Sequence, residues 1–169
     1  KAGDQKPILF VDVEDLSDVT VDTKWDCRYT GSKCTVPITI DGNGHTVYLS
    51  ATMFMDVGGG AVIKNSTTVQ DPNAAATDAE GNPVEFKMYR SPVIDLASGS
   101  SEDMPIIVEN VTNNVDVFET TSFNQDTVAG IIGRTDSDNY VVLNKIVNNG
   151  DMRSDDQTGG IIGNAGHAS

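Results

Sequence analysis

The sequence predicts an all-β fold in which short strands from successive repeats stack in parallel. The segment Ala129-Gly-Ile-Ile-Gly133 returns thirty residues later as Gly159-Gly-Ile-Ile-Gly163. An Asn-Asn-x-Asp motif occurs twice, at residues 113–116 and 148–151. Val and Ile together number 31 against 5 Leu, and branched side chains favour a pleated surface. A recurring period of this size indicates stacked structural units with almost no helix.

The two Gly-Ile-Ile-Gly segments are too short to bury themselves. If one lies on the other, their backbones pair at about 4.8 Å and each Ile packs on the Ile below. The Asn-Asn motifs supply the turns between the apolar stretches. In register, Asn113 and Asn148, or Asn114 and Asn149, would share side-chain amide hydrogen bonds. The alternative is that these residues act independently as turn formers.

Weaker copies of the same unit occur earlier in the chain. Ile63–Thr67 aligns with Val108–Thr112, and more loosely with Leu143–Val147. Ser91–Ala97 is a degenerate copy of Gly-Ile-Ile-Gly in which Pro92 and Asp95 replace the glycines. The stretch Asp41-Gly-Asn-Gly-His45 fits either a hairpin turn or a bend at one corner of a stack.

The chain divides into an N-terminal region, residues 1–36, and a repeat region, residues 37–169. The first region holds two candidate strands and a candidate cysteine hairpin, and we expect it to cap the stack. Six residues separate Cys27 from Cys34, and a turn between them predicts a disulfide-closed hairpin, the alternative being two free thiols. A disulfide would indicate an oxidising, extracellular compartment. Residues 70–87 are a polar insertion of the kind that emerges from one face of a repeat protein.

These motifs together resemble a known family. Ile38-Thr-Ile-Asp-Gly-Asn-Gly-His-Thr-Val47, Ala61-Val-Ile-Lys-Asn65 and the two Gly-Ile-Ile-Gly segments look like the right-handed parallel β-helix proteins of microbial cell surfaces that carry GLUG-type repeats, with pectate-lyase-like architecture. The resemblance implies a short right-handed parallel β-helix of three to four coils with a β-rich N-terminal cap. The alternative fold is an antiparallel β-sandwich, favoured by the alternation in residues 7–22 and 36–49.

The net charge of −14 argues against nucleic acid and anionic membranes as partners. No apolar run reaches membrane-spanning length, so we expect no membrane insertion. The charge suits a solvated surface, and it raises the question of divalent cations. We expect the acidic pairs of successive units to gather about four carboxylates on one edge, either as a Ca²⁺ site or as solvated loops: Asp136, Asp138, Asp155 and Asp156. No other cofactor is predicted.

The remaining candidate sites are weaker. Asn65-Ser-Thr67 and Asn110-Val-Thr112 match the N-glycosylation pattern. Trp25, beside the cysteine hairpin, is the best candidate for an exposed ligand contact. No spacing of acidic and basic residues predicts a catalytic residue, and fold analogy alone carries little functional weight.

These observations predict a non-catalytic, extracellular structural or adhesive module of a cell-surface protein or filament. The alternatives are a carbohydrate-binding module and, less favoured, a polysaccharide-active enzyme. The segment Gly159, Gly160, Ile161, Ile162 and Gly163 is the predicted strand-stacking edge. Its expected partner is the remainder of a longer surface protein or a second copy, and the segment Ile8–Val11 would suit a strand donated to that neighbour.

Overall fold

A computed structural model describes residues 9–10, 19–21, 25–26, 38–119, 127–136 and 138–166. Within these residues the regular structure is all β, with no helix. The strand pairs there are parallel except for one short hairpin, β8 (Ala76–Thr77) with β9 (Pro83–Val84). The prediction of an all-β fold with mostly parallel strands is therefore confirmed. The antiparallel sandwich is wrong, because strands of successive repeats pair with each other in the same direction.

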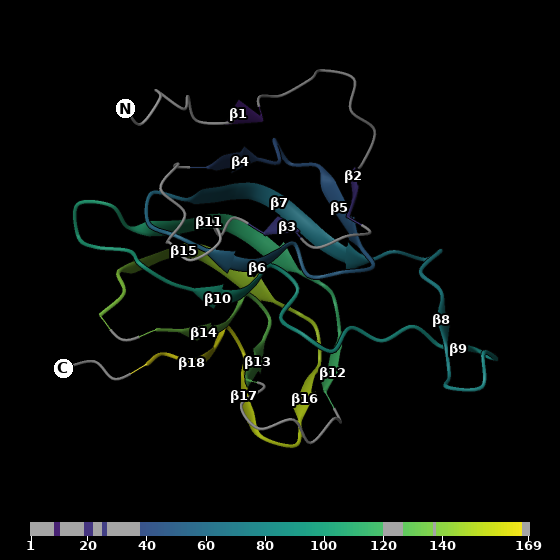
Figure 1. Ribbon diagram of the computed structural model, residues 1–169. Coiled ribbons are helices and arrows are strands. Elements are labelled where there is room, and N and C mark those ends of the chain that lie inside the picture. The colour runs from purple at the N-terminus through teal and green to yellow at the C-terminus, as the bar shows by residue number, and fades with distance from the viewer. Residues whose placement is uncertain are drawn as a thin grey trace, which may run out of the picture.

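The strands form five successive layers, which follow one another from the purple to the yellow end of the chain in Figure 1. The first layer holds β1 (Leu9–Phe10), β2 (Val19–Val21) and β3 (Trp25–Asp26). The second holds β4 (Thr39–Asp41), β5 (Thr46–Leu49) and β6 (Phe54–Val57). The third holds β7 (Val62–Gln70) and β10 (Ile94–Ala97). The fourth holds β11 (Ile106–Asn113), β12 (Val117–Glu119), β13 (Thr127–Ala129) and β14 (Ile132–Thr135). The fifth holds β15 (Val141–Asn148), β16 (Met152–Ser154), β17 (Gln157–Gly159) and β18 (Ile162–Asn164).

Two large sheets run through these layers. One has the order β1-β4-β7-β11-β15, with β5 also paired to β7 and β2 paired to β5, and the other has the order β3-β6-β10-β14-β18. The register confirms the repeat alignments. Ile132 pairs with Ile162 and with Ile94, and Val108 pairs with Ile63 and with Leu143. The Gly-Ile-Ile-Gly segments therefore lie one directly on the other.

The core lies between the two sheets and is built from columns of branched residues. Ile94, Ile131 and Ile132 are fully buried, as are Val108 and Val111. Burying each such side chain is worth about 1.5–3 kcal/mol. Because a short strand buries nothing alone, this stabilisation is gained only between layers.

The long strands bend in the middle, and the bend falls at one position of each layer. Asn65, Asn110 and Lys145 have φ of 55°, 52° and 53°, in the left-handed region that asparagine tolerates best among residues with a Cβ. In the second layer the bend is wider and spans Asp41–His45, between β4 and β5, which both pair with β7. This stretch is thus a bend of the stack, and the hairpin interpretation is wrong.

The N-terminal segment contributes a layer of its own. Strands β1, β2 and β3 pair in parallel with β4, β5 and β6, so Leu9–Phe10 pairs within the chain. Cys27 and Cys34 lie outside the described residues, so the disulfide remains a prediction. Much of the polar insertion at residues 70–87 forms the β8–β9 hairpin, which extends away from the layers (Figure 1). A helix long and apolar enough to cross a membrane is absent from the described part of the chain.

Candidate functional site

A ladder of buried and half-buried polar side chains, which we call the inner ladder, lies near the C-terminal ends of β7, β11 and β15. Thr68, Asn113 and Asn148 stand in one column of β7, β11 and β15. Thr68 Oγ1 donates to Asn113 Oδ1 at 2.7 Å, and Asn113 Nδ2 donates to Asn148 Oδ1 at 2.8 Å. Asn149 Nδ2 donates to Asn114 Oδ1 at 2.8 Å on the outside. The predicted sharing of amide hydrogen bonds is confirmed for both pairs.

Asn113 uses its full hydrogen-bonding capacity. Beyond the ladder, its Nδ2 donates to Val115 O at 3.0 Å and its Oδ1 accepts from Val115 N at 3.2 Å. Because the side chain is fully buried, each of these bonds replaces one that water would supply. Asn113 therefore fixes its own turn and ties it to the layers on both sides.

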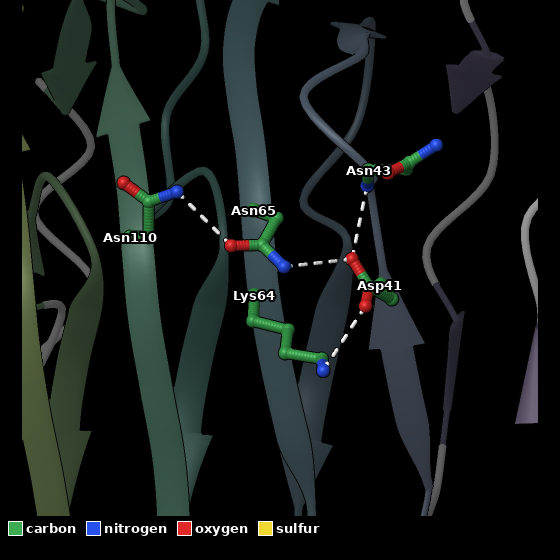
Figure 2. A network of polar contacts seen from close by, with 5 residues as sticks. All are labelled: Asp41, Asn43, Lys64, Asn65 and Asn110. Carbon is green, nitrogen blue, oxygen red and sulfur yellow. Dashed lines mark hydrogen bonds and ion pairs between the residues drawn. The ribbon is translucent and has the colours of Figure 1, made fainter.

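A second ladder runs along the outer bend and is shown in Figure 2. Asn110 Nδ2 donates to Asn65 Oδ1 at 3.0 Å, and Asn65 Nδ2 donates to Asp41 Oδ1 at 2.9 Å. Asp41 also accepts from Asn43 N at 3.0 Å and pairs with Lys64 Nζ at 3.0 Å. A carboxylate can only accept, so Asp41 ends this ladder at the N-terminal side.

The hydrogen bonds to Asp41 lower the pKa of its carboxyl group. The bond from the Asn65 amide contributes most, followed by the Asn43 backbone N–H, while Lys64 adds a smaller effect in the same direction. Partial burial opposes them, since it disfavours the charged form. The net lowering means that the ladder favours the ionised carboxylate.

We expect Asp41→Asn to flatten the acid side of the stability profile. A lowered folded-state pKa gives stability that is present above the ordinary value of about 3.9 and is lost as pH falls through the folded-state value. Between pH 6 and pH 2.5 the wild-type chain should lose about 1 kcal/mol more than the variant. Urea unfolding at both pH values measures this difference, and equal losses would show that Asp41 is not selectively bound as the anion.

The last layer leaves one face of the stack open. Ile131 and Ile132 are fully buried, whereas Ile161 and Ile162, directly above them, are only half-buried. Val128 is 1% exposed, and Thr158 above it is exposed. Each strand of this layer pairs with the layer below, and none pairs with a further strand among the described residues. The predicted edge, Gly159–Gly163, lies on this face.

The side chains of the open face differ from an ordinary surface. Core positions of the last layer are apolar yet only half-buried: Val141, Leu143, Ile146, Met152, Ile161 and Ile162. On the edge strand β15, Val142 and Val147 are 39% and 46% exposed. An apolar strand edge of this kind is a template for pairing with another chain segment.

Aromatic and cationic residues form a strip on the flank of the stack. The alignment of Met88 with Val117 and of Phe118 with Arg153 places Tyr89, Phe118 and Arg153 in one column. Lys87 Nζ lies 5.1 Å and Arg153 Cζ 5.4 Å from the Phe118 ring centre, and Arg90 Cζ lies 5.9 Å from that of Tyr89. Each such contact is worth about 0.5–1 kcal/mol at an exposed site. Tyr89 is 56% exposed, which makes it the accessible aromatic of the strip.

A polar hollow of about 260 Å³ lies beside the last two layers, between β13/β17 and β14/β18. Its lining consists of Thr127, Arg134, Asp156, Gln157 and Asn164. Asn164 Nδ2 donates to Gln157 Oε1 at 2.9 Å, so two of these groups already satisfy each other. Among the residues that the structure describes, its lining includes one carboxylate, Asp156, and no aromatic side chain.

The predicted gathering of four carboxylates is wrong. Asp136 follows β14 with its backbone beside Gly166, and Asp138 comes two residues later, whereas Asp155 and Asp156 lie in the turn between β16 and β17. The two pairs therefore occupy different corners of the layers. Within the described residues no group of three or more His, Cys, Asp or Glu side chains is close enough to hold a metal ion.

The structure gives the two glycosylation candidates another role. Asn65 is half-buried and Asn110 is exposed, and the amide nitrogen of each donates to the outer ladder. A glycan on Asn65 would compete with its bond to Asp41. Intact-mass measurement on secreted protein still tests both positions. The Trp25 backbone pairs with Phe54 in β6, while its side chain lies outside what the structure describes.

Sequence reasoning missed the strip and the outer ladder. The strip joins residues 87–90 to β12, across an irregular spacing that hides the column. The outer ladder joins Asp41 to Asn65, and the wide bend of the second layer breaks their alignment. An Asn at equal positions in Ile63–Thr67 and Val108–Thr112 was the available signal for half of it.

Comparison with known proteins adds no relative: no family model, no curated protein and no solved structure matches this chain.

Proposed function

We propose that this chain is a non-catalytic structural or adhesive module of an extracellular surface protein or filament, built as a short right-handed parallel β-helix. The observation that carries the proposal is the open face of the last layer, whose core columns are half-buried where those below are fully buried. Such a face is stabilised by covering it with more β-structure. The partner is either the rest of a longer surface protein or another chain. The extracellular location rests on the cysteine pair and on the resemblance to GLUG-repeat proteins.

Association through the open face can be tested with a charge placed in it. Thr158 is exposed in the column above Val128, so Thr158→Lys charges the face without removing a packed side chain. We expect the wild-type chain to associate with rising concentration in sedimentation velocity, and Thr158→Lys to suppress this. Thr77→Lys on the exposed hairpin is the matched control. Association that Thr158→Lys does not change would show that the contact lies elsewhere on the surface. Release of sugar fragments from polysaccharides would contradict a non-catalytic role.

The strip of Lys87, Tyr89, Arg90, Phe118 and Arg153 favours a second candidate function, carbohydrate binding. An exposed aromatic ring offers an apolar face to a sugar, and the adjoining cations supply hydrogen-bond donors. Asp116 and Asp151 directly precede β12 and β16, the strands that carry Phe118 and Arg153, and Asp151 N donates to Asp116 Oδ1 at 2.8 Å. Such a mixture of aromatic, cationic and acceptor groups suits the hydroxyl groups of a glycan.

Tyr89→Ala tests this second candidate. On a glycan array, we expect binding by the wild-type chain and at least a tenfold loss of affinity in Tyr89→Ala, which is about 1.4 kcal/mol. Tyr140, 47% exposed elsewhere on the surface, provides the matched Tyr140→Ala control. An equal loss in both variants, or no glycan bound at all, would remove carbohydrate binding by the strip.

A further inference from the structure

The inner ladder ends at the open face with a donor in excess. Asn148 Oδ1 accepts from Asn113 Nδ2 at 2.8 Å and from Gly150 N at 3.3 Å, while Asn148 Nδ2 donates to Gly150 O at 3.2 Å. One layer below, the equivalent Nδ2 of Asn113 makes two bonds, one within its turn and one to the next layer. The second N–H of Asn148 has no acceptor among the described residues. The ladder therefore has a direction, and its open end offers a donor.

On the same face, an unfilled space beside Gly160 matches this donor. The Asn148 side chain packs against Gly130 of the layer below, so closely that a Cβ at position 130 would overlap its carboxamide. Gly160 is the equivalent residue of the last layer, and a Cβ there would meet no atom within 4 Å. The glycine of the fourth layer thus makes room for an asparagine of the fifth, and the glycine of the fifth layer has room that no side chain of the described residues fills.

We propose that the open face is built for one kind of partner: a further parallel β-layer of the same repeat, with an asparagine in the column of Asn113 and Asn148. Its Oδ1 would accept the remaining N–H of Asn148, and its carboxamide would lie against Gly160. This inference rests on the proposed stacking function and specifies the partner's chemistry. Continuity with the contacts between existing layers is the argument for it, because each requirement repeats one already met between the fourth and fifth layers.

A second copy of the chain satisfies these requirements less well. In the same column the first described layer has Val19, through the pairs Val19 with Val47 and Val47 with Thr68, and a valine has no acceptor side chain. Two copies meeting through their open faces would oppose two donors, because each Asn148 Oδ1 already accepts two bonds. Contact between copies through this face leaves the ladder incomplete.

The test adds a layer to the whole chain. A copy of residues 137–166 is inserted after Gly166, in one variant unchanged and in another with leucine in place of the added asparagine of the ladder column. Amide hydrogen exchange of β15 and the thermal midpoint are measured in both. We expect the unchanged layer to slow exchange in β15 at least tenfold and to raise the midpoint, and the leucine layer to do clearly less.

Gly160→Ala provides an independent readout. In the natural chain the added methyl group meets open space, whereas in the extended chain it would occupy the space needed by the added asparagine side chain. We expect no effect in the first case and loss of most of the added protection in the second. Equal protection by the asparagine and leucine layers would overturn the ladder inference and leave stacking intact. Protection by neither layer would overturn stacking itself, so the two failures can be told apart.

Discussion

Asn113→Ala is expected to destabilise the protein by about 3 kcal/mol, because it removes a buried side chain that joins three layers. The substitution leaves Thr68 Oγ1 without its acceptor at 2.7 Å and Asn148 Oδ1 without its donor at 2.8 Å. It also removes both bonds to the Val115 backbone. Thr68 is itself fully buried, so water does not readily replace these bonds. The shift of the urea midpoint at constant slope measures the loss.

The neighbouring residue supplies the control for this prediction. Asn114 is exposed and accepts one side-chain bond, from Asn149 Nδ2 at 2.8 Å, so Asn114→Ala should cost about 0.5 kcal/mol or less. Asn113→Asp separates shape from hydrogen bonding, since a carboxylate keeps the size but places acceptors opposite Val115 O and Asn148 Oδ1. We expect it to be at least as destabilising as Asn113→Ala. Similar small losses at positions 113 and 114 would mean that the inner ladder does not hold the layers together.

The sequence was sufficient to predict the stacking contacts within the repeated motifs. Asn113 with Asn148 and Ile132 with Ile162 were paired by motif alone, and the register confirms both pairs. These predictions succeeded because a side chain that repeats at a fixed position falls on its own copy when layers stack in parallel. The degenerate copy at Ser91–Ala97 also aligned, and its Asp95 is accommodated by a bond from Arg90 Nη1 at 2.6 Å.

The carboxylate prediction failed because the two acidic pairs are not one layer apart: Asp155 follows Asp136 by only 19 residues (155 − 136), whereas paired residues of the last two layers are further apart in sequence. The offset is 35 residues between Val117 and Met152, but 30 residues between Thr127 and Gln157. The difference arises in one turn, which in the last layer is reduced to Asp155–Asp156 between β16 and β17. Neither offset relates Asp136 to Asp155, so the two pairs stand at different positions of their layers. Turn lengths of this kind depend on contacts across layers that no local pattern encodes.

The same limit applies to the flanking strip. Tyr89 and Phe118 share a column only because the β8–β9 hairpin, inserted ahead of Tyr89, extends away from the layers (Figure 1). A longer loop costs little stability, since each doubling of its length adds only about 0.6 kcal/mol to the free energy of loop closure. The pairing after such an insertion is set by which apolar residue fills the next core position, here Met88, which is 2% exposed.

Gly133→Ala is the second large effect that we expect, with a loss of about 3 kcal/mol. A Cβ at this position would lie 2.7 Å from Asp95 O, 2.8 Å from Thr127 O and 2.9 Å from Ser91 Oγ. Two of these atoms belong to the backbone, so no flexible side chain can move aside to make room. The Ser91 hydroxyl is held as well, because it accepts from Ala129 N at 2.9 Å. Thermal or urea unfolding measures the loss.

Gly160→Ala is the matched control, because its glycine belongs to the second copy of the same motif and its Cβ would meet nothing within 4 Å. We expect a change of about 0.5 kcal/mol or less. A small effect at Gly133 would contradict the close approach of the third and fourth layers. A large effect at Gly160 in the natural chain would instead mean that a partner already fills the space beside Gly160 in solution. That effect should then weaken on dilution, because a partner bound only to the folded chain stabilises it by mass action.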